Sequence, residues 1–339
     1  MRFQHFISLL CLAFLLNGCS AGQTMKNSYQ GNRYLENKDY RQGELTFREA
    51  VAQNPSDPLA NYYLGRFVLV QNKPKQALPY LKKAASLDRK NADYLFWQGV
   101  AHGELGNSKM ERESYQKALE LNARHVQALT YLGHNQFKAK EYEAALVTYN
   151  NVLEIWPNSP SALYNRALIA RILKHTPEEK AGWLAYLYRY PTGDFAITAT
   201  GYLNQLGDFS YQNHNLGGRT TTLTKIWYEP LTDKLAPISS RTLNVVGATA
   251  TNMSNSKLQV VVFQQNNKNL AKARAISIRR YLLAKYPGLT PDRIGISWFG
   301  KPEVFEIKGK KLQNPESVQF FFTDLDNGVQ SKKKQGKKK

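Results

Sequence analysis

The chain has 339 residues, a formal net charge of +20 and a hydrophobic content of 42%. A chain of this length is too large to fold around one ordinary hydrophobic core, so we expect two domains. The hydrophobic content allows a globular fold along nearly all of the chain. Both cysteines, Cys11 and Cys19, lie in the first 19 residues, which excludes a disulfide framework, a thiolate metal site or a cysteine nucleophile further along.

Residues 1–18 are predicted to be a secretory signal peptide. Arg2 is the only formal charge before an apolar run from Phe6 to Leu16, and this run is too short to span a membrane comfortably. The motif Leu16-Asn17-Gly18-Cys19 resembles a bacterial lipobox, in which Cys19 is lipidated and becomes the mature N-terminus. An ordinary signal peptide that contains a cysteine is the alternative.

Residues 19–23 are then the lipidated N-terminus and a short linker. Ser20 follows the cysteine, and by the lipobox resemblance this residue favours retention in the outer membrane, facing the periplasm. Several acyl chains on Cys19 would make that anchor stable.

Residues 24–206 are predicted to form a helical repeat array with a capping helix. Glycines recur every 34 residues, and an alanine occupies the fifth position: Gly31, Gly65, Gly99, Gly133 and Ala167. Such spacing predicts pairs of antiparallel helices, because a small residue lets the second helix approach the first closely. The pattern resembles the tetratricopeptide repeat (TPR) family and predicts five helix-turn-helix units, at 24–57, 58–91, 92–125, 126–159 and 160–193.

Individual units differ from the family pattern. The third unit departs from it at Glu111, and the fifth is largely degenerate. Asp194 is expected to cap a final helix that runs through about Leu206 and covers the apolar end of the array.

The TPR resemblance implies a concave groove that binds a protein partner. Its lining would come from fixed positions of the first helix of each unit. These positions give Tyr62, Arg66, Phe96, His134, Tyr164 and Arg171. Aromatic residues at this spacing are more often packing residues between helices than binding residues, and both interpretations stay open. The Lys and Asn pairs that clamp a terminal carboxylate in some TPR proteins are absent.

Residues 207–219, with Gly217-Gly218, are predicted to be a linker, and residues 220–325 an α+β domain. Helices are expected at 239–252 and 270–285. Strands are expected at 221–228, 258–263, 293–299 and 318–322. This order predicts helices on one face of a mixed sheet, so the overall fold class is an all-α TPR solenoid followed by an α+β sandwich.

The second helix of this domain begins with Asn267, Leu270, Ala271, Arg274 and Ala275. The spacing resembles the OmpA-like C-terminal domain, a module that holds peptidoglycan. By that resemblance Arg274 pairs with the carboxylate of diaminopimelate, and Asn267 lies beside it. An arginine that is simply solvated on the helix surface is the alternative.

The sequence departs from the OmpA-like pattern just before this helix. Where the family has an aspartate, this chain has Gln264-Gln265-Asn266. Gln264 and Gln265 can exchange hydrogen bonds with a ligand, but neither supplies a charge for its ammonium group.

Residues 326–339 contain six lysines and are predicted to be a disordered basic tail. For a secreted lipoprotein, anionic envelope polymers suit this charge better than nucleic acid, and a tail that is merely solvated is the alternative. Catalytic and metal-binding motifs are absent from the sequence, and Gly217-Gly218 lacks the ending of a phosphate-binding loop. Glu229 and Asp233 are a carboxylate pair that could in principle perform glycosidase chemistry, but they lie in a polar turn.

These features predict a non-enzymatic outer-membrane lipoprotein without a cofactor, which acts as a scaffold. Lipoproteins with TPR units resemble assembly factors of pilus or secretion systems, including the tight-adherence type. A peptidoglycan-tethering structural lipoprotein is the first alternative. A cell-wall hydrolase or its regulator is the second.

Overall fold

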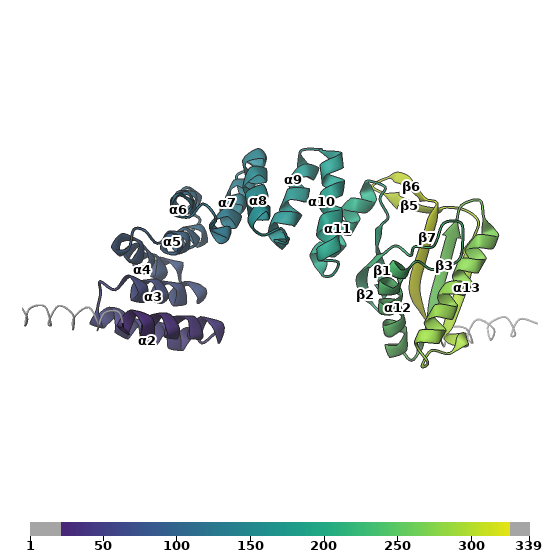
Figure 1. Ribbon diagram of the computed structural model, residues 1–339, viewed down its shortest axis with the longest axis horizontal. Coiled ribbons are helices and arrows are strands. Elements are labelled where there is room, and N and C mark those ends of the chain that lie inside the picture. Colours follow the sequence, from purple (N-terminus) through teal and green to yellow (C-terminus); the bar gives the residue numbers. More distant parts are fainter. Residues whose placement is uncertain (1–21, 326–339) are drawn as a thin grey trace, which may run out of the picture. The chain divides into compact units, whose positions relative to one another are not determined.

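The computed structural model describes residues 22–325 (Figure 1). The predicted signal peptide, Cys19 and the basic tail at 326–339 lie outside the described residues. The chain divides after Ala162 into two compact units. Within residues 22–325, none of the helices combines the length and hydrophobicity that crossing a membrane requires.

The first unit is a stack of antiparallel helices (Figure 1). Residues 22–36 are helical and precede α2. The helices that follow are α2 (Tyr40–Gln53), α3 (Pro58–Val70), α4 (Pro74–Leu87), α5 (Ala92–Glu104), α6 (Ser108–Leu121), α7 (Val126–Lys138) and α8 (Tyr142–Ile155). The predicted starts of the second, third and fourth repeat units coincide with the first residues of α3, α5 and α7, so the TPR-type solenoid is confirmed.

Local capping fixes these starts. The side chain of Asp57 accepts hydrogen bonds from the backbone N–H groups of the first turn of α3, and Asn91 does the same for α5. Pro58 is the first residue of α3, a position where the missing N–H costs nothing. His125 caps α7 through the N–H of Ala128.

The glycine series marks close approaches between helices. A Cβ atom at Gly31 would lie 2.4 Å from the ring of Tyr63, and one at Gly99 would lie 2.5 Å from the ring of Tyr115. In the fifth repeat the glycine lies on the second helix instead of the first, since Gly182 approaches the Cβ of Ala167. The small residues therefore make room for a large neighbour, as the 34-residue spacing predicts.

A second 34-residue series lies in the turns between the two helices of each repeat. Lys38, Asn72, Gly106, Lys140 and Lys174 all have left-handed backbone, with φ between 60° and 75°. A residue with a side chain pays about 1 kcal/mol there. Because four of the five positions lack glycine, composition does not reveal this series.

The second unit starts within α9 and ends its helical array with α11. The helices are α9 (Pro160–Ile172), α10 (Thr176–Arg189) and α11 (Asp194–Gln205). Asp194 was expected to cap the last helix, and this prediction is wrong. Gly193, at φ 88°, holds the N-cap position, and no side-chain cap is found there among the described residues.

The rest of the second unit is an α+β region with three small sheets. Its elements are β1 (Tyr211–Leu216), β2 (Arg219–Thr224), α12 (Ser240–Asn252), β3 (Ser256–Gln264), α13 (Lys268–Lys285), β4 (Ile294–Phe299), β5 (Glu303–Ile307), β6 (Lys310–Asn314) and β7 (Glu316–Asp324). In the largest sheet β3 lies parallel to β4 and antiparallel to β7, so the predicted mixed sheet is confirmed.

Alternate residues of β3 face the core of this region. Leu258, Val260 and Val262 are buried in one cluster with apolar side chains of α12 and α13, such as Val246 and Ile278. Both helices therefore cover the same face of the sheet, as the order of elements predicts.

Two parts of the predicted organisation are wrong. The segment 207–219 is not a linker, because it contributes to the hairpin β1–β2, whose turn is Gly217-Gly218 with φ 64° and 79°. The strand expected at 221–228 belongs to this hairpin and ends at Thr224. The predicted boundary at 206/207 also falls inside the second unit. There α11 packs on both strands, and Asn204 donates to the carbonyl of Tyr211.

Candidate functional site

Tyr62 and Phe96 are packing residues rather than groove residues. They are 8% and 3% exposed, respectively. The ring of Tyr62 packs against Tyr63 and Tyr94, and burial raises the pKa of Tyr62 to about 12. The ring of Phe96 packs against Tyr115. The prediction that these two rings contact a ligand is therefore wrong, because the neighbouring helices cover them.

Arg66 and its surroundings do present surface. The guanidinium of Arg66 lies 4.1 Å from the ring centroid of Trp97, and its Nη1 donates to the hydroxyl of Tyr62 at 3.0 Å. Its Nε is buried and has no acceptor among the described residues. A buried donor in this state is completed by water or by a ligand oxygen.

Two further side chains extend this surface along α7. Tyr131 is 41% exposed, and its ring contacts those of Phe96 and His134. Burial, aided by Lys138, lowers the pKa of His134, so this ring is neutral at pH 7. We call Arg66, Trp97, Tyr131 and His134 the Arg66 cluster; it joins one cation to a mainly aromatic surface.

Arg171 is used inside the second unit. It donates to Glu179 and to Gln205, each at 2.6 Å, and lies over the ring of Tyr202. These contacts tie α9 to α10 and α11, so the prediction of Arg171 as a groove residue is wrong. Tyr164, the other predicted groove residue of this unit, is half-buried among aromatic rings that include Trp183.

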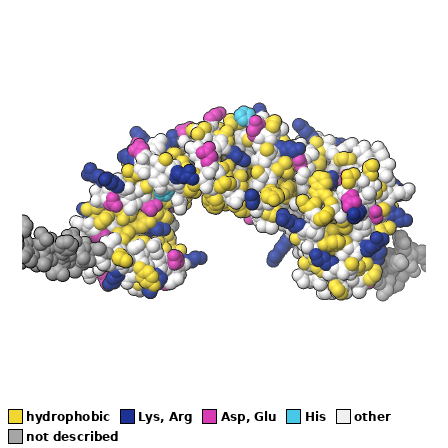
Figure 2. All heavy atoms as spheres, viewed as in Figure 1, with side chains coloured by type: hydrophobic (Ala, Val, Ile, Leu, Met, Phe, Trp, Pro, Cys, Tyr) yellow, Lys and Arg dark blue, Asp and Glu magenta, His cyan; other side chains and the backbone are white. Residues whose placement is uncertain are grey.

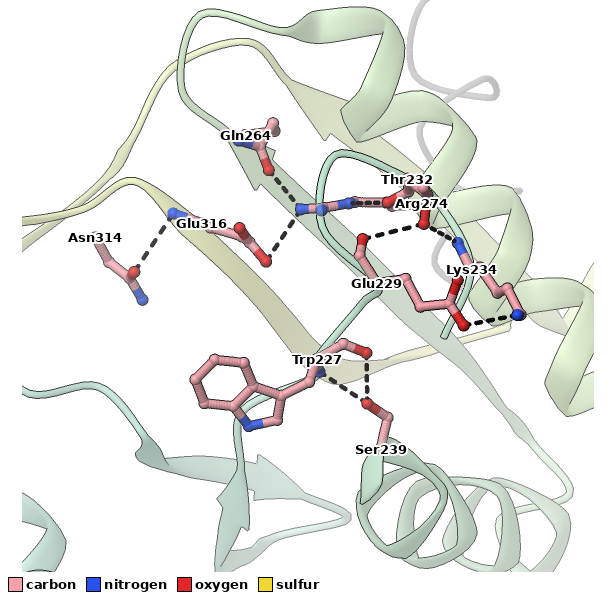
Figure 3. Close-up of polar contacts among 9 residues, drawn as sticks. All are labelled: Trp227, Glu229, Thr232, Lys234, Ser239, Gln264, Arg274, Asn314 and Glu316. Carbon is pink, nitrogen blue, oxygen red and sulfur yellow. Dashed lines mark hydrogen bonds and ion pairs between the residues drawn. The ribbon is translucent and has the colours of Figure 1, made fainter. Parts of the chain in front are cut away.

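Arg274 lies at the centre of a polar cluster in the α+β region (Figure 3). Its side chain is only 4% exposed, and its Nη1 forms an ion pair with Glu316 at 3.1 Å. Nη1 also donates to Gln264, and Nε donates to the carbonyl of Thr232 at 3.0 Å. The guanidinium lies 4.2 Å from the ring centroid of Tyr228, and burial raises the pKa of that phenol.

This arrangement changes both predictions for Arg274. It is not a solvated helix residue, and its charge is already neutralised by Glu316. A carboxylate from a ligand would have to displace Glu316. Sequence reasoning missed Glu316 because it lies on β7, 42 residues after Arg274, and local motifs do not encode such a pair.

The turn at 229–234 lies over Arg274 (Figure 3). Glu229 forms an ion pair with Lys234 at 2.6 Å. The hydroxyl of Ser239 accepts a hydrogen bond from the N–H of Trp227 and donates one to its C=O, which holds the backbone before the turn. Leu231 at the tip is 90% exposed with φ 60°. The turn therefore packs against Arg274 through the carbonyl of Thr232.

The other predicted residues of this site have structural roles. Asn267 caps α13 by accepting from the N–H of Leu270 at 2.9 Å. Gln265 is tied by its backbone N–H to the carbonyl of Pro315. Within residues 22–325, no group of three His, Cys, Asp or Glu side chains is placed to hold a metal ion.

Comparison with known families identifies the repeats. The family described as Tetratricopeptide repeat matches residues 30–92 and 68–125. The chain therefore contains tetratricopeptide repeats, and proteins with such repeats mediate protein–protein interactions.

Curated proteins are similar to part of the chain. Human protein O-mannosyl-transferase TMTC3 is 33% identical over 89 residues, which are 26% of this chain and 10% of that protein. DnaJ homolog subfamily C member 7 of Mus musculus is 27% identical over 177 residues, or 50% of this chain and 34% of that protein. The chain thus spans about a third of the length of one of these relatives and a tenth of the other.

Among solved structures, similarity extends to Pseudomonas aeruginosa pilF and to MamA. The pilF structure is 17% identical to this chain with a TM-score of 0.48, and the match covers 54% of this chain and 88% of the pilF chain. The MamA structure is 19% identical to this chain with a TM-score of 0.44, and the match covers 47% of this chain and 93% of the MamA chain.

Proposed function

We propose that the chain is a non-enzymatic scaffold whose repeats hold an extended segment of a partner protein against the Arg66 cluster. The observation that carries this proposal is the buried Nε of Arg66, which has no acceptor among the described residues. A carboxylate or backbone carbonyl of the partner would complete it. Trp97 and Tyr131 offer the aromatic surface that concentrates binding energy in protein interfaces.

The proposal is tested by photo-crosslinking in cells of the source organism. A photoreactive phenylalanine replaces Tyr131 and, as a control, Val147, which is 61% exposed on α8. We expect a specific crosslinked protein from position 131 that is absent from position 147. Crosslinking of the same protein from position 147 alone would place the interface elsewhere.

Arg66→Ala is then combined with the photoreactive residue at 131. A hydrogen bond to a charged group contributes about 1.5–3 kcal/mol, so the yield is expected to fall by about tenfold or more. Arg124→Ala is the matched control, because Arg124 is exposed in the turn before α7. An unchanged yield with Arg66→Ala would contradict the role of Arg66.

We further propose that this scaffold is an outer-membrane lipoprotein facing the periplasm, anchored through Cys19. The support is the Leu16-Asn17-Gly18-Cys19 motif alone. Cys19→Ser is expected to abolish labelling by radioactive palmitate and to release the chain from the membrane fraction. Cys11→Ser is the control and should keep both. Membrane retention of Cys19→Ser would refute the anchor.

An assembly role in a pilus or secretion system, including the tight-adherence type, follows from the same combination of anchor and repeats. Deleting the gene is expected to reduce surface pili or secreted protein without stopping growth. A mutant with unchanged pili and secretion would remove this part of the proposal.

A second candidate is a wall-tethering lipoprotein with an OmpA-like domain. It is favoured by the hydrogen bond between Gln264, the last residue of β3, and Arg274 on α13, the helix that follows, although the family has an aspartate where this chain has glutamine. Because Glu316 forms an ion pair with Arg274, we propose that the wild-type chain binds peptidoglycan weakly and that the Glu316→Gln variant binds it more tightly. The measurement is co-sedimentation with purified peptidoglycan, with Glu306→Gln as an acidic control on β5. Strong sedimentation of wild type that is lost in Glu316→Gln would contradict this account.

The hydrolase alternative lacks a comparable arrangement in the described part of the chain. Glu229 is paired with Lys234, and Asp233 lies in the same exposed turn. Clearing of a zymogram containing cell wall would nevertheless revive this alternative.

A further inference from the structure

The junction between the third and fourth repeats differs from its neighbours at matched positions. Glu111 and Asn135 hold positions that are apolar one repeat earlier, where Ala77 and Ala101 stand. One repeat later the equivalents are Ala145 and Ile169. Two polar side chains therefore replace apolar ones between α6 and α7.

These polar residues form a buried network. The amide Nδ2 of Asn135, which is 4% exposed, donates to Glu111 Oε2 at 2.9 Å and to the carbonyl of Ser108 at 3.0 Å. Its Oδ1 accepts from Arg112 Nε at 2.8 Å. Tyr115 donates to the other oxygen of Glu111. Because its members are hydrogen-bonded to one another, the network holds the guanidinium of Arg112 in one place.

A cavity of about 450 Å³ opens beside this network. Its lining residues are Ser108, Lys109, Arg112, Asn135, Lys138 and Ala139. The volume is in the range of small-molecule sites. Three of these six side chains are cations and none is acidic.

The concentration of cations is specific to this junction. One repeat earlier, Lys75 is the counterpart of Lys109, but Leu78 and Glu104 stand where Arg112 and Lys138 would be. One repeat later, the counterpart of Lys109 is Glu143. On the face drawn in Figure 2, Lys and Arg side chains are scattered over both units.

The start of α6 adds partial positive charge to the same cavity. Ser108, Lys109 and Arg112 all belong to its first turns, and no side-chain cap is found at Asn107 among the described residues. Backbone N–H groups at a helix start, together with cationic side chains, favour multivalent anions. Arg112 also pairs with Glu141 at 2.9 Å, which fixes its orientation and offsets part of its charge, and Glu111 lies in the same first turn of α6, so Lys109 and Lys138 supply most of the net positive charge.

We infer that this cavity binds the phosphate group of a small phosphorylated or pyrophosphate-bearing molecule. The cavity lining shares no residue with the Arg66 cluster, although both use α7, so each proposal is tested by its own variants. Phosphate suits a cavity lined by three cationic residues better than a carboxylate does, because it carries up to two negative charges and three acceptor oxygens.

The test is calorimetric titration of the full chain with inorganic pyrophosphate at low ionic strength, with citrate as a polycarboxylate comparison. The double variant Lys109→Gln/Lys138→Gln removes two lining charges. Lys75→Gln/Lys90→Gln is the matched control, because it removes the same charge from exposed positions one repeat earlier. We expect the dissociation constant for pyrophosphate to rise at least tenfold in the first variant and to change less than twofold in the control.

Hydrogen exchange locates the binding and checks the fold. Pyrophosphate is expected to slow exchange in the first turn of α6 and in the last turn of α7, and circular dichroism should be the same for all variants. Undetectable binding at millimolar pyrophosphate, equal weakening in both variants, or tighter binding of citrate than of pyrophosphate would each overturn the inference.

Discussion

Replacing Arg274 tests whether it is a structural residue or a binding residue. In Arg274→Met the apolar volume is largely kept, but Glu316 loses its ion-pair partner and the carbonyl of Thr232 loses its donor. Breaking a buried ion pair costs about 3–5 kcal/mol. Because the Glu316 side chain is 31% exposed, water offsets part of this cost, and about 3 kcal/mol of local stability is expected to be lost.

The assay has to be local, since the chain consists of two compact units and a single melting temperature is not defined for it. Hydrogen exchange of peptides from β3 and α13 reports the opening free energy of this region. A loss of about 3 kcal/mol corresponds to roughly a 100-fold fall in protection. Arg280→Met is the matched control, because Arg280 is exposed on the same helix and its replacement should cost under about 0.5 kcal/mol.

Two results decide the matter. If Arg274→Met and Arg280→Met lower protection equally, Arg274 is a surface residue and the reasoning from its burial is refuted. The double variant Arg274→Met/Glu316→Leu removes both charges together. It should recover most of the protection, since apolar pairs replace buried ion pairs with little loss.

Three further predictions concern stability. His214 is 5% exposed, and burial lowers its pKa from 6.5 to about 4, so below pH 6.5 the imidazole binds a proton in the unfolded chain but not in the folded one. The stability of the second unit should therefore be full above pH 6.5 and fall by up to about 3 kcal/mol as the pH drops to 4. The urea midpoint of His214→Gln should depend less on pH than that of the wild type. Gly99→Ala places a Cβ 2.5 Å from Tyr115 and should cost about 1–3 kcal/mol, more than the roughly 1 kcal/mol of helix propensity gained, measured by hydrogen exchange of peptides from α5 and α6. Gly201→Ala, which meets no described atom within 4 Å, should instead stabilise α11 by up to about 1 kcal/mol, and equal effects at the two glycines would contradict the packing role of Gly99. Leu231→Gly relieves a left-handed leucine that is 90% exposed and should raise the stability of the turn by about 1 kcal/mol, measured by hydrogen exchange at 229–234.

The repeats were predictable because their causes are local. Asp57, Pro58 and Asn91 start helices through side chains and ring geometry within a few residues. The hairpin β1–β2 was not predictable in the same way. The buried face of β1 carries Gln212 and His214, so the strand lacks the apolar alternation that marks a half-buried strand.

The candidate sites also combine features that the sequence predicts with contacts between distant residues that it does not. Arg66 and Arg274 were both identified from the sequence, but their states depend on residues far along the chain. Trp97 covers the guanidinium of Arg66, and Glu316 neutralises Arg274. The third cationic site, at Arg112, was visible only as a departure from the repeat pattern at Glu111, because its cavity requires the first turns of α6 and the end of α7 together.

The left-handed residues in the repeat turns leave this array below the stability that its own geometry permits. Glycine at Lys38, Lys140 and Lys174 would each relieve about 1 kcal/mol of strain, and glycine at Asn72 would relieve less, because asparagine adopts the left-handed conformation readily; these substitutions touch neither the helices nor the cavity lining. Their effects should add, because the turns lie one full repeat apart. The thermal tolerance of the solenoid is therefore adjustable in four small steps, each independent of what the protein binds.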